Sequence, residues 1–398
     1  MKSTPGNILD TIGNTSLVPL RNVVPKNGAR LFVKLESQNP TGSMKDRIAL
    51  EMIEAPERDG RLKPGGAVVE YTGGSTGVSL ALVCAVKRHP LHLVSSDAFS
   101  KEKLDHMRLL GAKLTLVASD NGKQTEKLTK DMIREAHRIA GETGAYITAQ
   151  MENTDQLNAY TKMADEIWEQ TGGRLDGFVQ SVGTAASLRG ISRRLREHDA
   201  RIRIAGVEPA ESAVLSGGPT GAHKIDGIGA GYVVPLWRDG IADELERVST
   251  EEARAMAFRL AAEEGLFCGT STGANVTGAL RLAERLGRRR GIVLRYVDRS
   301  QRNWRIATRR TAWPGRHDRD DHVRHRHEVP EVVRANDGLT AIGRSRIVLH
   351  RDRFRLAQQV NGDQRDRHGR HDADDPVAGM APCGREGLGF THVRFTHG

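Results

Sequence analysis

The feature that most constrains the fold is an alternation of short β-like runs with longer helical runs over residues 1–300. This alternation predicts an α/β fold, a mostly parallel sheet with helices on both faces. Ligands of such folds bind at the carboxyl ends of the strands, so the glycine-rich turns there are where chemistry is expected. The expected strands are residues 31–35, 67–71, 91–95, 113–117, 145–149, 177–182, 203–207 and 291–296. The expected helices are residues 75–87, 101–110, 123–143, 155–170, 186–198, 250–264 and 273–285, one of them opened by a capping box of Ser249 and Glu252.

Lys45 stands where a Pro-Thr-Gly-Ser turn, residues 40–43, passes into an apolar helical segment that includes Ile48. Most lysines are solvated surface charges. A lysine at a helix start lies near backbone N–H donors and the positive end of the helix dipole, which disfavours its ammonium form. An amine in this position is a candidate Schiff-base nucleophile.

Four further segments are rich in glycine and hydroxyl residues. Residues 70–77 suit a carboxylate or phosphate at a helix N-terminus, although a tight turn with a serine N-cap explains the pattern equally well. Residues 181–190 place a Gly-Thr turn before a helix, where backbone donors and hydroxyls hold a phosphate. Residues 223–232 contain three glycines in five positions, which predicts a backbone held close to another group rather than a floppy linker. Residues 268–275 either contribute to a site or only cap a helix.

Composition narrows the class of protein. The three cysteines, Cys84, Cys268 and Cys383, are far apart, which argues against a disulfide framework or a zinc site and for a reducing compartment. No signal region is present and no run approaches about 18 apolar residues, so we expect a cytoplasmic protein without a membrane partner. The net charge is +10, but more than half of it comes from residues 301–398, so a nucleic-acid partner is not expected. No metal site is predicted.

Five motifs in register carry a resemblance to a known family. They are N-P-T-G-S-x-K-D-R at 39–47, T-G-G-x-T-G at 72–77, G-T-x-x-S at 183–187, H-K-I-x-G-I-G-A-G at 223–231 and G-x-S-x-G-A at 269–274. From residue 7 to about residue 296 the chain resembles the cysteine synthase (O-acetylserine sulfhydrylase) and cystathionine β-synthase family. The resemblance implies the two-domain, tryptophan-synthase-β-like fold of pyridoxal-phosphate enzymes (fold type II). Residues 1–40 with 151–297 would then form the larger, cofactor-binding domain and residues 41–150 a smaller, mobile one.

The resemblance also assigns roles. Lys45 would be the catalytic residue, joined to pyridoxal 5'-phosphate as an internal aldimine. The cofactor would further be bound by Ser75, Gly183, Thr184, Ala185, Ala186, Ser187 and Ser271, the last of these at the pyridine nitrogen. The amino-acid substrate would be bound by Thr72, Gly73, Gly74, Thr76, Gln150 and Gly227.

The implied reaction is β-replacement on an activated serine such as O-acetylserine. Sulfide or another thiol would add to an aminoacrylate intermediate and give cysteine or an S-substituted cysteine, in a homodimer. Three alternatives stay open: a cystathionine β-synthase-like reaction, β-elimination from serine or threonine, and a non-catalytic relic of the fold.

The chain departs from the family pattern at several positions. Ser75 replaces a usual asparagine and Gly73 a usual serine, while Ala185 and Ala186 replace a Gly-Gly pair. If the phosphate loop needs a positive φ, alanine there costs about 1 kcal/mol. Residues 298–398 lose lysine and become rich in arginine and histidine. We interpret this segment as a disordered or out-of-frame tail, with a genuine basic tail for an acidic partner as the alternative.

Overall fold

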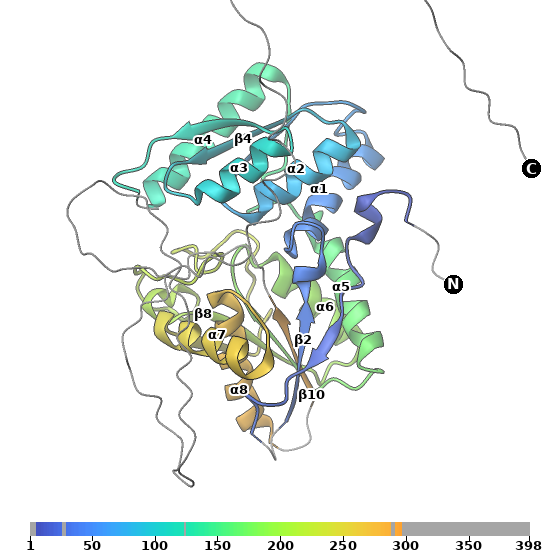
Figure 1. Cartoon of the computed structure of the whole chain (residues 1–398), viewed down its shortest axis with the longest axis vertical. Coiled ribbons are helices and arrows are strands. Elements are labelled where there is room, and N and C mark those ends of the chain that lie inside the picture. Colours follow the sequence, from blue (N-terminus) through green and yellow to red (C-terminus); the bar gives the residue numbers. More distant parts are fainter. Residues whose placement is uncertain (1–4, 26–28, 123–124, 288–290, 297–398) are drawn as a thin grey trace, which may run out of the picture. The chain divides into compact units, whose positions relative to one another are not determined.

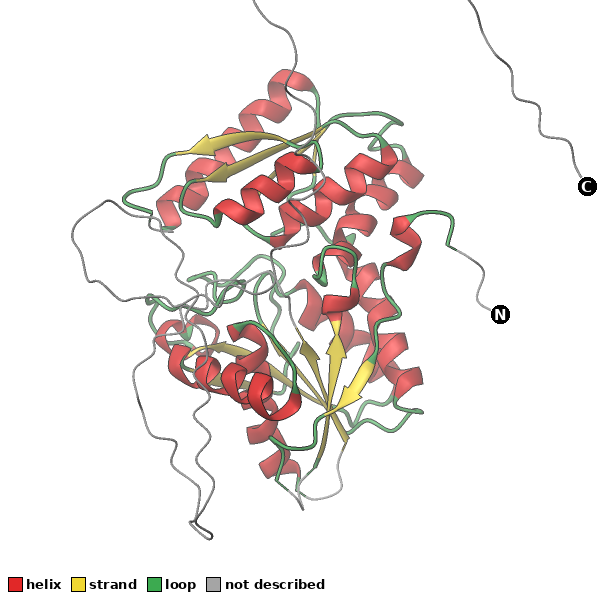
Figure 2. Ribbon diagram, in the orientation of Figure 1, coloured by secondary structure: helices red, strands yellow, loops and turns green. Residues whose placement is uncertain are grey.

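The computed structural model describes residues 5–25, 29–122, 125–287 and 291–296. The predicted tail at 298–398 lies outside these residues, as does Cys383. The described strands form two sheets, which appear as two separate groups of arrows in Figure 2. Among the described strands, every pairing except that of one short edge strand is parallel, so the predicted α/β fold with parallel-rich sheets is confirmed.

The first sheet has six strands in the order β1-β2-β10-β7-β8-β9. β1 is the antiparallel edge strand. β10 is the last of the six in sequence, yet it lies between β2 and β7, so the sheet joins segments that are far apart in the chain. The strands are β1 (Leu17–Pro19), β2 (Arg30–Leu35), β7 (Gly177–Ser181), β8 (Arg203–Pro209), β9 (Glu244–Val248) and β10 (Gly291–Tyr296).

Helices bury both faces of the six-stranded sheet. Phe178 packs in the core formed with α5 and α6, while its neighbour Val179 packs in the core formed with α7 and α8. Successive side chains of a strand point to opposite faces, so a continuous apolar run is expected of a strand that is buried on both sides. These helices are α5 (Gln156–Gln170), α6 (Ala186–His198), α7 (Thr250–Glu264) and α8 (Thr270–Leu286).

The second sheet has four parallel strands in the order β5-β4-β3-β6. Val69 and Val94 pack against α4 on one face, and Val68 and Leu93 belong to the core with α1, α2 and α3 on the other. The four helices are labelled around this sheet in Figure 1. The strands are β3 (Val68–Tyr71), β4 (Leu91–Ser96), β5 (Lys113–Val117) and β6 (Tyr146–Ile147). The helices are α1 (Lys45–Asp59), α2 (Ser75–Lys87), α3 (Lys101–Leu109) and α4 (Glu126–Thr143).

All expected strands and helices are present, and the predicted capping box at the start of α7 is confirmed. The expected strand at 145–149 is shortened to Tyr146–Ile147, because Ala149 turns the chain with φ +46°. Two strands were missed: β1 is only three residues long, and β9 carries charged residues that break the apolar pattern. Cys84 and Cys268 are buried in the core. No helix in the described part of the chain is both long and apolar enough to span a bilayer.

Candidate active site

The predicted site residues lie on segments that leave the carboxyl ends of strands. Lys45 follows β2 and the loop at 183–187 follows β7, and these two strands lie parallel on either side of β10. The loop at 72–76 follows β3 and Gln150 follows β6, and these strands are parallel neighbours in the second sheet. The two segments of each pair therefore leave their sheet at the carboxyl ends of its strands, where ligands of parallel α/β proteins bind.

Lys45 is the first residue of α1, at the helix start that the sequence predicts. Buried Asp46 fixes the turn before it, because its carboxylate accepts hydrogen bonds from the backbone N–H of Thr41 at 2.8 Å and from the hydroxyl of Thr41 at 2.5 Å. The Thr41 hydroxyl also lies 3.4 Å from the hydroxyl of Ser79 in α2. The turn that carries Lys45 is thus bonded to the helix that follows the predicted carboxylate loop.

A charge cluster of Lys34, Glu36, Arg47 and Glu166 anchors α1. Arg47 Nε donates to Glu36 at 2.7 Å, and Arg47 Nη1 donates to Glu166 at 2.7 Å. Lys34 Nζ also pairs with Glu166 at 2.7 Å. Burial alone would raise the pKa of Glu166, but the hydrogen bonds and charges of Arg47 and Lys34 outweigh burial and lower that pKa to about 2. The cluster fixes the first turn of α1 to β2 and α5.

The predicted carboxylate loop meets Gln150 directly. The Thr76 hydroxyl donates to Gln150 Oε1 at 2.7 Å, and Gln150 Nε2 donates to the carbonyl of Tyr71 at 3.2 Å. Gly74 is the N-cap of α2 and Ser75 its first residue, so the alternative of a serine N-cap is wrong. A Cβ built on Gly74 would meet nothing within 4 Å. The loop therefore borders open space at a helix N-terminus, beside an amide group.

Gly73, which departs from the family pattern, is explained by Phe99. A Cβ built on Gly73 would lie 2.1 Å from ring atoms of Phe99, in the segment between β4 and α3. The Phe99 ring packs against the core around Tyr71 and Val94. The ring fills the space that a serine side chain at position 73 would need. Sequence reasoning missed Phe99, since nothing local links it to Gly73.

The predicted phosphate loop does contain a residue with positive φ. This is the condition under which alanine is expected to destabilise the loop. Ala185 has φ +67° and is the N-cap of α6, whereas Ala186 is the first helical residue. The exposed fractions of Ala185 and Ala186 are only 1% and 0%, so both methyl groups point into the core. The Thr184 hydroxyl accepts a hydrogen bond from the Ala186 N–H at 3.4 Å. The backbone of Ala185 is therefore strained. The methyl groups of Ala185 and Ala186 point into the core and not toward the open side of the loop.

The glycine-rich segment at 223–231 lies against this loop. A Cβ built on Gly183 would be 2.6 Å from the carbonyl oxygen of Gly227, so glycine is required for this approach. The backbone N–H of Gly229 donates to the carbonyl of Val182 at 3.0 Å. A Cβ built on Gly227 itself would meet nothing within 4 Å. Gly183 and Gly227 are therefore brought together, and Gly227 borders open space.

Ser271 lies in the first turn of α8 and is buried. One turn further on, Asn275 Oδ1 accepts a hydrogen bond from the backbone N–H of Ser181 at 2.6 Å. Asn275 was given no role from the sequence, although it lies in the segment at 268–275. Its bond fixes the N-terminal part of α8 to the end of β7, just before the loop at 183–187.

These residues fit pyridoxal phosphate. The first turn of the 13-residue helix α6 has N–H groups that lack an intrahelical acceptor, with the hydroxyls of Thr184 and Ser187 beside them, which is the donor set that a phosphate requires. Lys45, which follows β2, supplies an amine at the same carboxyl ends of the strands of the six-stranded sheet. Gly74 and Gly227 each have open space where a Cβ would lie, so neither residue obstructs a ligand at its own position.

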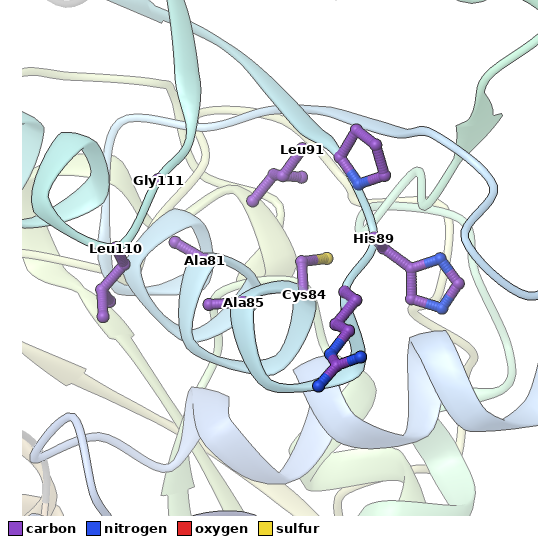
Figure 3. A pocket seen from close by; sticks show the side chains of 9 residues that line it. Ala81, Cys84, Ala85, His89, Leu91, Leu110 and Gly111 are labelled. Carbon is purple, nitrogen blue, oxygen red and sulfur yellow. The ribbon is translucent and has the colours of Figure 1, made fainter. Parts of the chain in front are cut away.

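A cavity of about 200 Å³ lies elsewhere, at the C-terminal end of α2. Figure 3 shows Ala81, Cys84 and Ala85 on the helix that forms one wall, with Leu91 opposite. Burial raises the pKa of the Cys84 thiol to about 12, so this thiol is neutral at physiological pH. None of the predicted site residues lines this cavity.

Comparison with known proteins agrees with this geometry. A family model described as pyridoxal-phosphate dependent enzyme matches residues 8–295. A cysteine synthase of Staphylococcus aureus is 38% identical over 289 residues, which cover 72% of this chain and 91% of that protein. The crystal structure of O-acetyl serine sulfhydrylase isoform 3 from Entamoeba histolytica is 36% identical, with a TM-score of 0.69, covering 75% of this chain and 89% of that one.

A third relative is a solved O-acetylserine dependent cystathionine beta-synthase from Helicobacter pylori. It is 32% identical, with a TM-score of 0.69, and the match covers 75% of this chain and 96% of that one. The chain belongs to the family of pyridoxal-phosphate dependent enzymes. Its relatives within that family include cysteine synthases, which confirms the resemblance found in the motifs.

Proposed function

We propose that this enzyme catalyses β-replacement on an activated serine, such as O-acetylserine, with sulfide or another thiol as the incoming group. The observation that carries the proposal is the hydrogen bond of Thr76 to Gln150 at the open side of the loop at 72–76, which forms a polar site suited to an amino-acid carboxylate. The names of the relatives, cysteine synthase and O-acetyl serine sulfhydrylase, support this choice of substrates.

Pyridoxal phosphate, when bound, supplies an electron-withdrawing ring that stabilises negative charge at the substrate Cα. Lys45 would hold the cofactor covalently, and Ser75 would contact the ring. Ser271 would hydrogen-bond the ring nitrogen. A hydroxyl cannot stabilise a protonated ring nitrogen as a carboxylate would, which favours loss of a β-leaving group over transamination. The phosphate would be held by Gly183, Thr184, Ala185, Ala186 and Ser187.

The substrate carboxylate would lie at the N-terminus of α2, against Thr72, Gly73, Gly74 and Thr76. Gln150 Nε2 carries two protons, of which the hydrogen bond to Tyr71 uses one, so the other can be donated to the carboxylate. Gly227, with open space in front of its Cα, would lie close to the substrate without obstructing it.

Lys45 Nζ would be released when the substrate amine replaces it on the cofactor, and would then act as the general base that removes the proton from the substrate Cα. The leaving group, acetate for O-acetylserine, departs from Cβ with its bonding electron pair. The incoming thiolate forms a new bond to Cβ. Lys45 would then return the proton to Cα, and Lys45 Nζ would replace the product amine on the cofactor, which releases the product and restores the starting state.

We further propose the division into a larger domain, residues 1–40 with 151–297, and a smaller, mobile domain, residues 41–150. The four-stranded sheet uses strands from 41–150 only, and the six-stranded sheet uses none of them, which supports this division. Closure of the smaller domain would keep water away from the reacting Cβ. We expect the enzyme to work as a cytoplasmic homodimer.

A second candidate reaction uses a thiol-bearing amino acid as the nucleophile and gives cystathionine. The match to an O-acetylserine dependent cystathionine beta-synthase favours this alternative over simple elimination. The two reactions share the leaving group and differ only in the incoming thiol, so one assay distinguishes them.

The test uses the full chain loaded with pyridoxal phosphate. We expect a visible absorption band that changes when O-acetylserine is added, followed by product formation with sulfide or with homocysteine. Lys45→Ala should remain folded by circular dichroism and lose covalent attachment, measured by mass spectrometry after borohydride reduction. A chain that binds no cofactor would contradict the proposal and favour the non-catalytic relic. Attachment that persists in Lys45→Ala would contradict the role of Lys45.

A further inference from the structure

Glu70 is a fully buried acid in the middle of an apolar strand. It lies in β3 with 0% exposure, and its neighbours Val68, Val69 and Tyr71 are buried too. Its carboxylate accepts three hydrogen bonds. Oε1 accepts from the N–H of Tyr71 at 2.9 Å, and Oε2 accepts from the hydroxyl of Thr148 at 2.5 Å and from the N–H of Gln150 at 3.0 Å.

This arrangement is costly for the fold. Among the hydrogen bonds and ion pairs of the described residues, Glu70 has no cationic partner. Burial raises the pKa of Glu70 to about 7, which the three hydrogen bonds only partly oppose. An uncompensated acid in a core is retained where it serves a site, since an apolar residue would give a more stable strand.

The bond to Gln150 follows a strained turn. Ala149, directly before Gln150, has φ +46°, a conformation that is unfavourable for a residue with a Cβ. Glu70 holds the N–H of Gln150 on one side of this turn. On the other side, Gln156 Nε2 donates to the carbonyl of Gln150 at 2.6 Å. The main chain of Gln150 is therefore fixed at both of its polar groups.

The side chain of Gln150 is oriented as well. Nε2 donates to the Tyr71 carbonyl, and Oε1 accepts from the Thr76 hydroxyl. Tyr71 is also the residue whose N–H is held by Glu70. Glu70 thus holds two main-chain groups around the Gln150 side chain. It accepts from the N–H of Tyr71, whose carbonyl is the acceptor for Nε2, and from the N–H of Gln150 itself.

We propose that Glu70 is a positioning residue, which fixes the strained turn at 149–150 so that the Gln150 amide points at the substrate carboxylate. The inference rests on the proposed function, because it takes the loop at 72–76 with Gln150 as the carboxylate site. Glu70 touches neither substrate nor cofactor and acts only through Gln150. Glu70→Gln replaces one carboxylate oxygen with an NH₂ group, which is itself a donor. At least one of the three hydrogen bonds to this side chain is therefore lost.

The test is a double-mutant cycle on the cofactor-loaded enzyme with Glu70→Gln, Gln150→Ala and the combined variant. Calorimetric binding of L-alanine, with L-alaninamide as the probe that lacks the carboxylate, reports the carboxylate contact without turnover. We expect Glu70→Gln and Gln150→Ala each to weaken L-alanine binding about tenfold, as for loss of one hydrogen bond to a charged group, and to leave L-alaninamide binding unchanged. Because Glu70 acts through Gln150, the combined variant should bind L-alanine as Gln150→Ala does.

Glu208→Gln is the matched control. Glu208 is equally buried, with 1% exposure, and its carboxylate likewise holds a turn, accepting from the N–H of Leu215 at 2.9 Å and of Ser216 at 3.0 Å. It should change stability without changing the ratio of L-alanine to L-alaninamide affinity. If Glu70→Gln does not fold, Thr148→Val removes one donor to the same carboxylate and should change the ratio in the same direction.

The outcomes separate the two proposals. If Gln150→Ala leaves L-alanine binding unchanged, the carboxylate site itself is wrong. If Gln150→Ala weakens binding and Glu70→Gln does not, only the positioning role is overturned. Full additivity in the combined variant overturns it as well, because Glu70 would then act independently of Gln150.

Discussion

The hydroxyl of Thr76 donates a 2.7 Å hydrogen bond to Oε1 of Gln150, a residue 74 positions later in the chain. This bond joins the first turn of α2 to the turn after β6. It also decides which way the amide faces, because Nε2 must then face the Tyr71 carbonyl. Two loops from neighbouring strands are thereby combined into one polar site.

Replacing Thr76 with valine should weaken substrate binding. Valine has the same shape but cannot hold Gln150 Oε1, so the amide loses its fixed orientation. We expect the KM for O-acetylserine to rise about tenfold, with the cofactor absorption unchanged. Thr76→Ser keeps the hydroxyl and should stay close to the parent value. An unchanged KM in the valine variant would contradict the assignment.

Gly73 and Phe99 should be energetically coupled. A serine at 73 clashes with the Phe99 ring, so Gly73→Ser should lower the free energy of unfolding by about 1–3 kcal/mol, as overpacking does. Phe99→Ala in the same chain opens the space and should recover part of that loss. Urea unfolding of the two single variants and the double variant measures the coupling. Additive changes would contradict the contact.

The two alanines of the proposed phosphate loop, Ala185 and Ala186, should respond differently to glycine. Both substitutions remove a buried methyl group, but only Ala185 has a positive φ. Ala186 is helical, where glycine is unfavourable. We therefore expect Ala185→Gly to be less destabilising than Ala186→Gly by about 1 kcal/mol. Equal losses in thermal unfolding would show that the backbone conformation at Ala185 carries no cost.

The charge cluster predicts an acid-dependent loss of stability. The pKa of Glu166 is lowered from 4.5 to about 2 in the folded chain, so its contribution is present above pH 4.5 and disappears as the pH falls toward 2. A shift of this size corresponds to about 3 kcal/mol, and Glu166→Gln should lose most of it at neutral pH. Unfolding free energies measured from pH 7 to pH 3 should therefore be flatter in the variant.

The control for this measurement is Glu263→Gln. Glu263 pairs with Arg259 on the exposed surface of α7, and such pairs contribute little to stability. This variant should keep the pH dependence of the parent protein. If it flattens the curve as much as Glu166→Gln does, the dependence does not come from the buried cluster.

Much of the fold follows from local pattern. The bounds of α2, α6 and α7 were predicted to the residue, because apolar periodicity and helix-start signals agree there. β9 could not be predicted, since its sequence, Glu-Leu-Glu-Arg-Val, has too few apolar residues for a strand pattern, and it is its pairing with β8 that makes it extended. The order of strands within each sheet also depends on contacts that no local pattern contains.

The candidate site also has parts that local sequence predicts and parts that depend on contacts between distant segments. Lys45 and the loops were found because helix starts and glycines have local signatures. Phe99 is known only from its contact with Gly73, 26 positions away in sequence, and this contact is set by packing. Glu70 did carry a signal, a single charge among buried apolar residues of a strand, but two of its three donors, Thr148 and Gln150, come from a turn that local periodicity does not place.

The place of β10 in the six-stranded sheet affects how the protein is made. The four-stranded sheet uses residues 68–147 only, so it can form while the rest of the chain is still being synthesised. β2 and β7 must instead wait for residues 291–296, which pair with both of them. Until the ribosome releases that segment, the nascent chain presents two unpaired strand edges, and this is the stage at which it most needs protection from aggregation.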